Sequence, residues 1–230
     1  MSTIAIITAR GGSKRIPKKN IKDFCGKPII AYSIEAALDS KSFDEVMVST
    51  DSEEIAEIAK RYGARVPFMR SEKTSSDYAT TRDVILEVLD NYKSRGLYFD
   101  EVVCIYPTAP FINGEILNTA IKSLRNNNAS MLVPVVRFSY PPQRAYIIVD
   151  NQLVFKNEEY RNARSQDLEP LYHDAGQFYC YKTKDYLENN GIIKDNVTSL
   201  ILPETLVQDI DNYDDWKIAE LKFKLMRGLL

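Results

Sequence analysis

Short apolar runs alternate with amphipathic segments through the first part of the chain, and this alternation limits the folds that the sequence can adopt. The apolar runs are residues 4–7, 46–49, 102–106 and 131–136. The segments with helical spacing between them are residues 28–38, 53–62, 84–89 and 114–125. A nearly continuous apolar run is typical of a strand that is buried on both faces. The alternation therefore predicts an α/β fold with a mostly parallel sheet flanked by helices.

The pattern changes in the second half of the chain. Residues 138–171 are polar and arginine-rich, contain prolines, and are too long for a simple connection. Within them, residues 147–155 predict a β-hairpin, because Asp150 and Asn151 both tolerate the positive φ of a two-residue turn. The remaining elements are a strand at residues 177–181 and a helix at residues 214–226. We therefore expect a single domain, residues 1–230, with an inserted excursion at residues 138–171.

Charge is unevenly distributed along the sequence. The chain has 30 Lys and Arg residues against 32 Asp and Glu residues, a net charge of −2. Six of the basic residues lie from Arg10 to Lys22, a stretch without an acidic residue. One concentrated positive locus suits a compact polyanion such as a triphosphate, whereas a nucleic-acid duplex needs a broader basic face. We therefore expect no nucleic-acid partner.

Compartment and membrane association follow from features that the sequence lacks. No stretch approaches about 18 consecutive apolar residues, and the first residues have neither the basic start nor the apolar length of a signal peptide. Cys25, Cys104 and Cys180 show no metal-type spacing, and the last two lie within apolar runs. We expect a cytoplasmic protein with reduced cysteines and no membrane partner.

The residues after the first predicted strand have the composition of a phosphate-binding loop, and we call residues 10–20 the basic loop. Gly11 and Gly12 permit close approach of the backbone to a phosphate and a positive φ where needed. Arg10 can place two donors on phosphate oxygens. Further donors come from Ser13, Lys14 and Lys19. The spacings of the Walker A loop and the dinucleotide fingerprint are both absent. Because ligands bind beyond the carboxyl ends of parallel strands, the loop predicts a triphosphate site rather than a solvated basic turn.

A resemblance to a known family begins at this loop. The motif T-A-R-G-G-S-K-R-I-P-K-K-N at residues 8–20, followed by F-x-G-K-P at residues 24–28, resembles the signature of the acylneuraminate cytidylyltransferases, the CMP-sialic acid synthetases. The similarity runs through nearly the whole chain and resembles in particular the bacterial branch that acts on pseudaminic acid. It implies a Rossmann-like sheet of the nucleotide-diphospho-sugar transferase type, with residues 138–171 as a substrate and dimerisation excursion. It also implies a homodimer that uses CTP and Mg²⁺ to activate an acidic nine-carbon sugar.

The resemblance also implies which residues bind the nucleotide. Phosphate and ribose contacts would come from Ala9, Arg10, Gly11, Gly12, Ser13, Lys14, Lys19 and Asn20. Cytosine would be read by Arg70, Ala79, Thr80 and Thr81, in a run that begins at Asp77. Backbone groups and a threonine hydroxyl can read the amino donor and the acceptors of cytosine. The alternative for the two threonines is helix capping. The catalytic residues would be Arg10, Lys14, Lys19 and Asp209.

Asp209 and Asp211 form a carboxylate pair near the end of the chain. In an extended segment, residues two positions apart project to one face, so the two carboxylates converge. Together with ligating phosphate oxygens they match the ligands that Mg²⁺ prefers. The sequence therefore predicts Asp209 and Asp211 as metal ligands, with a second role for Asp209 in orienting the attacking hydroxyl. The structural alternative is that Asp211 or Asp214 caps the following helix.

An acidic sugar needs a cation in its pocket, and the arginines of the excursion are candidates. Residues 164–168 are similar to the R-x-Q-D-L substrate segment of the family. The resemblance implies substrate contacts from Tyr106, Thr108, Arg144, Arg164, Gln166, Tyr172, His173, Asp174 and Gln177. The alternative for the arginines, Arg161 included, is solvent exposure or pairing with Glu158, Glu159 or Glu169. For His173, the only histidine, the alternative is packing.

Two departures from the sialic acid synthetases indicate which sugar is bound. Those enzymes commonly carry Gln where Tyr106 precedes the turn at residues 107–110, and they read N-G-A where this chain has Ala175, Gly176 and Gln177. Both departures resemble the pseudaminate branch, so we expect pseudaminic acid. The alternatives are N-acetylneuraminate, 3-deoxy-manno-octulosonate, a hexose 1-phosphate, or a nucleotide-binding module without catalysis.

Overall fold

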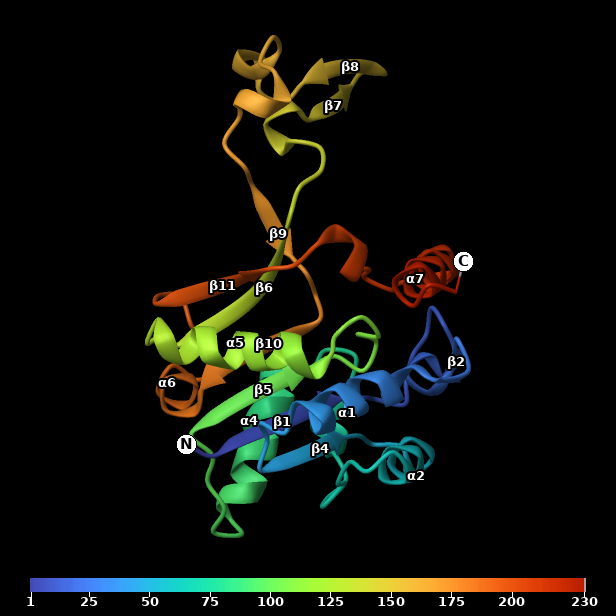
Figure 1. Cartoon of the computed structure of the whole chain (residues 1–230), viewed down its shortest axis with the longest axis vertical. Coiled ribbons are helices and arrows are strands. Elements are labelled where there is room, and N and C mark those ends of the chain that lie inside the picture. The colour runs from blue at the N-terminus through green and yellow to red at the C-terminus, as the bar shows by residue number, and fades with distance from the viewer. Residues whose placement is uncertain (230) are drawn as a thin grey trace.

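The computed structural model describes residues 1–229, in which a central sheet is covered by helices on both faces (Figure 1). The strands follow the order β11–β6–β10–β5–β1–β4, and β9 pairs with β6 outside this path. Their bounds are β1 (Thr3–Thr8), β4 (Glu45–Ser49), β5 (Glu101–Ile105), β6 (Met131–Arg137), β9 (Tyr172–Asp174), β10 (Phe178–Lys182) and β11 (Val197–Ile201). β1 runs parallel to β4 and β5, β11 runs parallel to β6, and β10 lies antiparallel between β5 and β6. The predicted α/β class is confirmed, and β9 and β11 are strands that the sequence pattern did not indicate.

Helices and short strands complete the secondary structure. The α-helices are α1 (Ile29–Ser40), α2 (Glu53–Arg61), α3 (Glu72–Ser75), α4 (Thr81–Lys93), α5 (Gly114–Asn126), α6 (Thr183–Glu188) and α7 (Tyr213–Met226). The short strands are β2 (Asp23–Phe24), β3 (Lys27–Pro28), β7 (Tyr146–Val149) and β8 (Gln152–Phe155). The 3₁₀ turns are η1 (Lys19–Ile21), η2 (Pro142–Arg144), η3 (Glu158–Tyr160), η4 (Ser165–Asp167) and η5 (Glu204–Leu206). None of the helices in residues 1–229 combines the length and apolar character needed to cross a bilayer.

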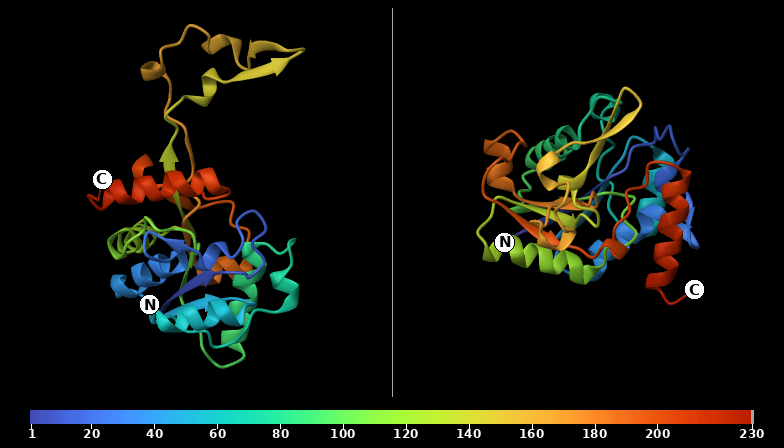
Figure 2. Two further views of the ribbon diagram at one scale, coloured as in Figure 1. Left: turned by 90° about the vertical axis from the view of Figure 1, so that its right-hand side faces the viewer. Right: turned by 90° about the horizontal axis from the view of Figure 1, so that it is seen from above.

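Alternate side chains of β1 enter two different cores, because successive residues of a strand point to opposite faces. Ile4 and Ile6 are fully buried in a cluster with residues of α4 and α6. Ala5 and Ile7 are fully buried against α1, α2 and α5 on the other face. Figure 2 shows these helices on the two sides of the sheet. The near-continuous apolar run of β1 is thus the consequence of burial on both faces.

A third, aromatic cluster lies beside the sheet, where α7 packs near α1 and β2. Phe24 contacts Trp216 and Phe223 edge-to-face, with ring centroids 5.4 Å and 5.5 Å away. The same cluster buries Ile16 from the basic loop and Ile210 from the segment of the carboxylate pair, each 1% exposed. Two regions that are far apart in sequence are therefore fixed to one another by packing.

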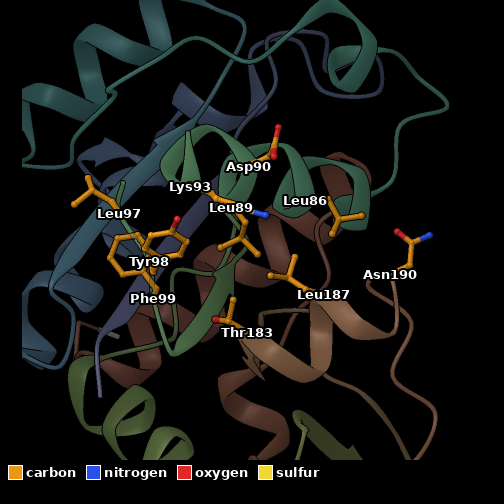
Figure 3. A pocket seen from close by; sticks show the side chains of 10 residues that line it. All are labelled: Leu86, Leu89, Asp90, Lys93, Leu97, Tyr98, Phe99, Thr183, Leu187 and Asn190. Carbon is orange, nitrogen blue, oxygen red and sulfur yellow. The ribbon is translucent and has the colours of Figure 1, made fainter. Parts of the chain in front are cut away.

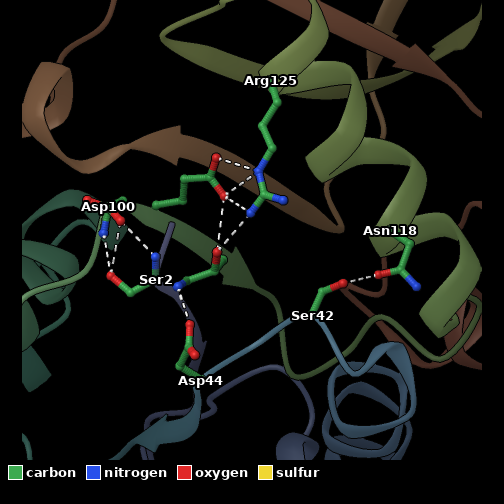
Figure 4. A network of polar contacts seen from close by, with 8 residues as sticks. Ser2, Ser42, Asp44, Asp100, Asn118 and Arg125 are labelled. Carbon is green, nitrogen blue, oxygen red and sulfur yellow. Dashed lines mark hydrogen bonds and ion pairs between the residues drawn. The ribbon is translucent and has the colours of Figure 1, made fainter.

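A polar network joins the start of β1 to β5 and α5 (Figure 4). Arg125 on α5 pairs with the nearly buried carboxylate of Glu101, with 2.6 Å between Nη2 and Oε2. The hydroxyl of Thr3 donates to the same oxygen over 3.1 Å. Hydrogen bonding to Glu101 raises the pKa of Arg125 above its ordinary value. This network lies at the opposite end of β1 from the basic loop.

Residues 138–171 project from the sheet as an arm that carries the β7–β8 hairpin (Figures 1 and 2). Asp150 and Asn151 have φ values of 49° and 61°, which confirms the predicted two-residue turn. The hairpin exposes apolar side chains, among them Ile148 at 76% and Leu153 at 66%.

Candidate active site

The basic loop leaves the carboxyl end of β1 and borders a cleft of about 230 Å³, which we call the active-site cleft. Its lining residues are Thr8, Arg10, Ser13, Arg15, Ile16, Lys19, Asn20, Tyr106, Pro107 and Thr108. They follow β1 and β5, which are neighbours in the sheet. The cleft thus lies where strand polarity predicts a ligand, and it brings predicted phosphate residues together with Tyr106 and Thr108 from the predicted sugar side.

The loop keeps its shape through hydrogen bonds of its own backbone. The amide nitrogen of the Asn20 side chain donates to the Arg10 carbonyl over 2.9 Å, and the Gly11 N–H donates to Asp51 over 2.8 Å. A Cβ on Gly11 would lie 3.2 Å from the Cβ of Ser52, so any other residue would crowd Ser52 there. Neither Gly11 nor Gly12 adopts a positive φ; the left-handed residue of the loop is Lys18, with φ 53°.

Four carboxylates from other parts of the chain contact the loop, three of them through its cations and one through a backbone N–H. Arg10 Nη1 lies 2.9 Å from Asp77 Oδ1, and Lys14 pairs with the other oxygen of the same carboxylate. The remaining contacts are Arg15 with Asp211 at 2.6 Å, Lys18 with Glu54 at 2.7 Å, and the Gly11 N–H with Asp51. Arg10 and Lys14, which are predicted to bind the phosphates, are therefore paired with a carboxylate of the protein itself.

Lys19 is a partly buried cation of the loop. Its ammonium donates to the carbonyl oxygen of Ile210 over 2.6 Å. Burial lowers the pKa of Lys19, and the charges of Asp211 and Asp209 oppose that shift. Lys19 thus joins the predicted phosphate site to the segment of the carboxylate pair.

Asp209 and Asp211 flank Ile210 and remain free of helix capping. The N-cap of α7 is Asn212, whose side-chain oxygen accepts from the N–H groups of Asp214 and Asp215, so the structural alternative of capping by Asp211 or Asp214 is wrong. Asparagine suits this position because its short side chain reaches the first free N–H groups of a helix. Burial, followed by the charge of Asp211, raises the pKa of Asp209. Residues 1–229 contain no cluster of three or more metal-ligating side chains.

The predicted cytosine segment borders the same end of the sheet. Arg70 is buried and donates to the Ser49 carbonyl over 2.6 Å and to the Ser49 hydroxyl over 3.0 Å, and burial lowers its pKa. Thr80 caps α4 in a reciprocal capping box with Asp83, which confirms the structural alternative for this residue. The Thr81 hydroxyl lies 3.5 Å from the Tyr106 hydroxyl, so this segment adjoins the cleft.

A tyrosine pair extends the site beyond Tyr106. The ring of Tyr179 meets the ring of Tyr106 edge-to-face at 5.7 Å, and its hydroxyl donates to Asp174 over 2.7 Å. Burial raises the pKa of both tyrosines, so their hydroxyls stay protonated and act as donors. Tyr179 was not predicted as a site residue, although it lies on β10 only two residues beyond Gln177.

Gln177 and His173 were predicted to contact the sugar, but in the structure both make contacts within the protein. Gln177 is 2% exposed, and its amide nitrogen donates to the Leu206 carbonyl over 2.6 Å. It thereby supports the chain just ahead of Asp209. The ring of His173 packs against Phe138 with centroids 4.9 Å apart, as in the packing alternative, and its Nδ1 lies 2.8 Å from the Asp174 carbonyl oxygen.

The arm carries three predicted substrate residues, Arg144, Arg164 and Gln166, and none of them lines the active-site cleft. Arg144 contacts the Ser165 hydroxyl over 3.3 Å, and Arg164 pairs with Asp167 at 2.7 Å. Arg161 pairs with Glu158, which matches its structural alternative. Gln166 borders a separate cleft of about 480 Å³ at the base of the arm. Tyr172 lies on β9, between the arm and the sheet.

A further cleft of about 350 Å³ lies between α4, residues 97–99 and α6 (Figure 3). Its lining is mainly apolar, with Leu86, Leu89 and Leu187 pointing into it. None of the residues predicted to bind nucleotide, sugar or metal lines it.

Comparisons with known proteins show the family of this chain. A family model described as cytidylyltransferase matches residues 4–213. The pseudaminic acid cytidylyltransferase of Campylobacter jejuni is 44% identical over 226 residues, covering 98% of this chain and 97% of that protein. The CMP-N,N'-diacetyllegionaminic acid synthase of Legionella pneumophila is 33% identical over 237 residues, covering all of both chains.

A solved structure of a CMP:2-keto-3-deoxy-manno-octonic acid synthetase, in complex with CTP, has the same fold. It is 18% identical in sequence, with a TM-score of 0.72 and complete coverage of both chains. The predicted resemblance is thus confirmed by sequence over nearly the full length and by the fold. The chain belongs to the cytidylyltransferase family.

Proposed function

We propose that this protein transfers the CMP group of CTP to the anomeric hydroxyl of pseudaminic acid and releases pyrophosphate. The observation that carries the proposal is the meeting of the basic loop with Tyr106 and Thr108 in one cleft. The choice of sugar is supported by the 44% identical pseudaminic acid cytidylyltransferase and by the departures at Tyr106 and Gln177.

The reaction is a displacement at the α-phosphorus of CTP. The anomeric oxygen forms a bond to phosphorus, the bond from phosphorus to the bridging oxygen of pyrophosphate breaks, and the hydroxyl proton is lost to a base. Arg10, Lys14 and Lys19 neutralise the charge on the phosphates, and Ser13 and Asn20 orient them. Catalysis of this kind depends on alignment and fixed positive charge. Asp209 is placed beside Lys19, which suits it to orient the attacking hydroxyl.

Asp209 and Asp211 are the residues that would hold Mg²⁺. Their fit to this ion rests on the raised pKa of Asp209, to which the neighbouring charge of Asp211 contributes, because a bound cation would relieve that repulsion. Magnesium ions usually take one or two protein carboxylates together with substrate phosphates, so a larger protein cluster is not required. When bound, the ion supplies charge neutralisation on the phosphate oxygens.

The arm supports a homodimer as part of the proposed function. It exposes an apolar hairpin, and it carries Arg144, Arg164 and Gln166 outside the cleft of their own chain. A second copy could receive the hairpin and accept these residues toward its sugar. We also propose a cytoplasmic location, where CTP is available.

The test is a substrate panel with pyrophosphate release as the signal. The protein is incubated with Mg²⁺, each nucleoside triphosphate in turn, and pseudaminic acid, N-acetylneuraminate, 3-deoxy-manno-octulosonate or a hexose 1-phosphate. We expect CTP with pseudaminic acid to give the highest kcat/KM. Turnover of a hexose 1-phosphate without turnover of any nine-carbon acid would refute the proposal. CTP binding without turnover of any sugar would favour the non-catalytic module.

A further inference from the structure

One carboxylate bridges two cations of the basic loop. Asp77 Oδ1 accepts from Arg10 Nη1 over 2.9 Å, and Asp77 Oδ2 accepts from the Lys14 ammonium. Arg10 Nη1 also lies 3.3 Å from the Ser76 carbonyl oxygen. Two oxygens of one anion thus face an arginine and a lysine, which is the arrangement that two oxygens of a phosphate would adopt.

Asp77 lies in a short segment with fixed ends, residues 76–79, which we call the strap. On one side, the Thr74 hydroxyl donates to Glu87 over 2.6 Å. On the other side, Thr80 is held in its capping box with Asp83 at the start of α4. Between these anchors the strap has no regular secondary structure, and the side chain of Tyr78 is 95% exposed. The middle of the strap can therefore move without disturbing α3 or α4.

The two ion pairs of Asp77 are of the kind that another anion can displace. The side chain of Asp77 is 46% exposed and that of Lys14 is 76% exposed. Exposed pairs are weak because water and salt screen them. Hydrogen bonding to Lys14 keeps the pKa of Asp77 below its ordinary value, so the carboxylate is charged at neutral pH. A polyphosphate carries several charges and can replace both contacts at once.

We propose that Asp77 is an internal competitor for the polyphosphate site, bound to Arg10 and Lys14 when the site is free and displaced when phosphates enter. The inference rests on the proposed role of Arg10 and Lys14 in binding the phosphates of CTP. It adds a positioning role: Asp77 holds the two cations in place between turnovers. It also lowers the affinity of the site for free pyrophosphate and thereby favours release of that product.

The direct test measures binding of inorganic tripolyphosphate by isothermal titration calorimetry to the wild-type protein and to Asp77→Asn. The variant keeps the shape of the side chain and removes its charge. We expect tripolyphosphate to bind about three- to tenfold more tightly, because two weak pairs no longer compete. Cytidine, which has no phosphate, should bind equally to both proteins.

The matched control is Glu72→Gln, which removes an exposed carboxylate from α3, the helix just ahead of the strap. Glu72 takes part in none of the ion pairs found in residues 1–229. A merely electrostatic effect of lost charge would tighten tripolyphosphate binding equally in both variants, and that result would overturn the proposal. Unchanged or weaker binding in Asp77→Asn would overturn it as well.

A kinetic readout separates competition from a structural role. In Asp77→Asn we expect a lower inhibition constant for pyrophosphate, by a similar three- to tenfold factor, and a lower KM for CTP. A raised KM would show that Asp77 assists nucleotide binding and would contradict the proposal. Failure of the proposed function would give a different result. The protein would not turn over pseudaminic acid, but tripolyphosphate would still bind more tightly to Asp77→Asn than to the wild type. Absence of tripolyphosphate binding in every variant would refute the polyphosphate site itself.

Discussion

The ammonium group of Lys19 donates a hydrogen bond of 2.6 Å to the carbonyl oxygen of Ile210, a residue 191 positions further along the chain. Ile210 stands between Asp209 and Asp211, so this bond places a cation of the basic loop next to the carboxylate pair. The phosphates and the metal would have to meet at this point for the proposed reaction. Substitution of Lys19 therefore tests the predicted phosphate site and the predicted metal site together.

Replacing Lys19 by methionine should lower kcat/KM by about 10²- to 10³-fold, the usual effect of removing one buried donor that stabilises a transition state. Lys19→Arg, which keeps the charge, should retain more activity than Lys19→Met. Steady-state kinetics with CTP and the best sugar of the panel measures both. Equal activity in the methionine variant and the wild type would show that Lys19 has only a structural role.

Asp209→Asn and Asp211→Asn should each abolish most turnover at ordinary Mg²⁺ concentrations, while CTP still binds weakly through the basic loop. The reason is that each substitution removes one of two proposed carboxylate ligands. Activity as a function of Mg²⁺ concentration is the measurement, with CTP binding by calorimetry as the second readout. Wild-type turnover in both variants would show that Asp209 and Asp211 are not the metal ligands.

Gln177→Leu should raise the Mg²⁺ concentration needed for half-maximal activity by a few-fold, with a smaller effect on kcat. The substitution removes the hydrogen bond to the Leu206 carbonyl, worth about 1 kcal/mol, and loosens the chain ahead of Asp209. Gln152→Leu, at an exposed position of β8, is the control for side-chain chemistry. If the main effect were a raised KM for the sugar, Gln177 would be a direct substrate contact as the family resemblance implies.

Arg125→Leu should destabilise the fold by about 2–3 kcal/mol without changing the KM for CTP. It leaves the carboxylate of Glu101 buried without its partner, at the end of β1 remote from the cleft (Figure 4). Thermal and denaturant unfolding measure the loss. The double variant Glu101→Leu with Arg125→Leu should recover part of it, since no buried charge then remains. A raised KM for CTP in Arg125→Leu would argue against this separation of stability from binding.

Ile148→Lys should convert the proposed homodimer into monomers. Ile148 is 76% exposed on the hairpin of the arm, and a charge there would oppose burial against a second copy. Sedimentation velocity across a concentration series is the measurement. Leu187→Lys, in the cleft between α4 and α6, is the matched control (Figure 3). If Leu187→Lys dissociated the dimer and Ile148→Lys did not, the dimer interface would lie at the cleft between α4 and α6 rather than at the hairpin.

Much of the fold could be predicted because it depends on local sequence. The strands β1, β4, β5 and β6 are apolar runs, and the hairpin turn uses Asp150 and Asn151, which tolerate a positive φ better than most residues with a side chain. β9 and β11 were missed because their apolar signal is weak: all three residues of β9 are exposed, and those of β11 alternate between exposed and partly buried. The antiparallel direction of β10 depends on the path of the whole chain, which periodicity does not contain.

Several residues that line the cleft could be predicted from the sequence, whereas the contacts between them could not. Arg10, Ser13, Lys19 and Asn20 line the cleft as the motif indicates. The bridge from Asp77 to Arg10 and Lys14 joins residues more than 60 positions apart, and a single sequence gives no signal for such a pair. That Asn212 rather than Asp211 or Asp214 caps α7 could not be predicted either, because Asn and Asp are both good N-cap residues.

The aromatic cluster that buries Ile16 and Ile210 makes the site part of one cooperative unit with α7. Both residues reach the cleft region from a core that Phe24, Trp216 and Phe223 complete. Local opening of α7 would therefore separate the basic loop from the carboxylate pair before the central sheet is affected. The catalytic geometry of this protein is thus only as stable as the docking of its last helix.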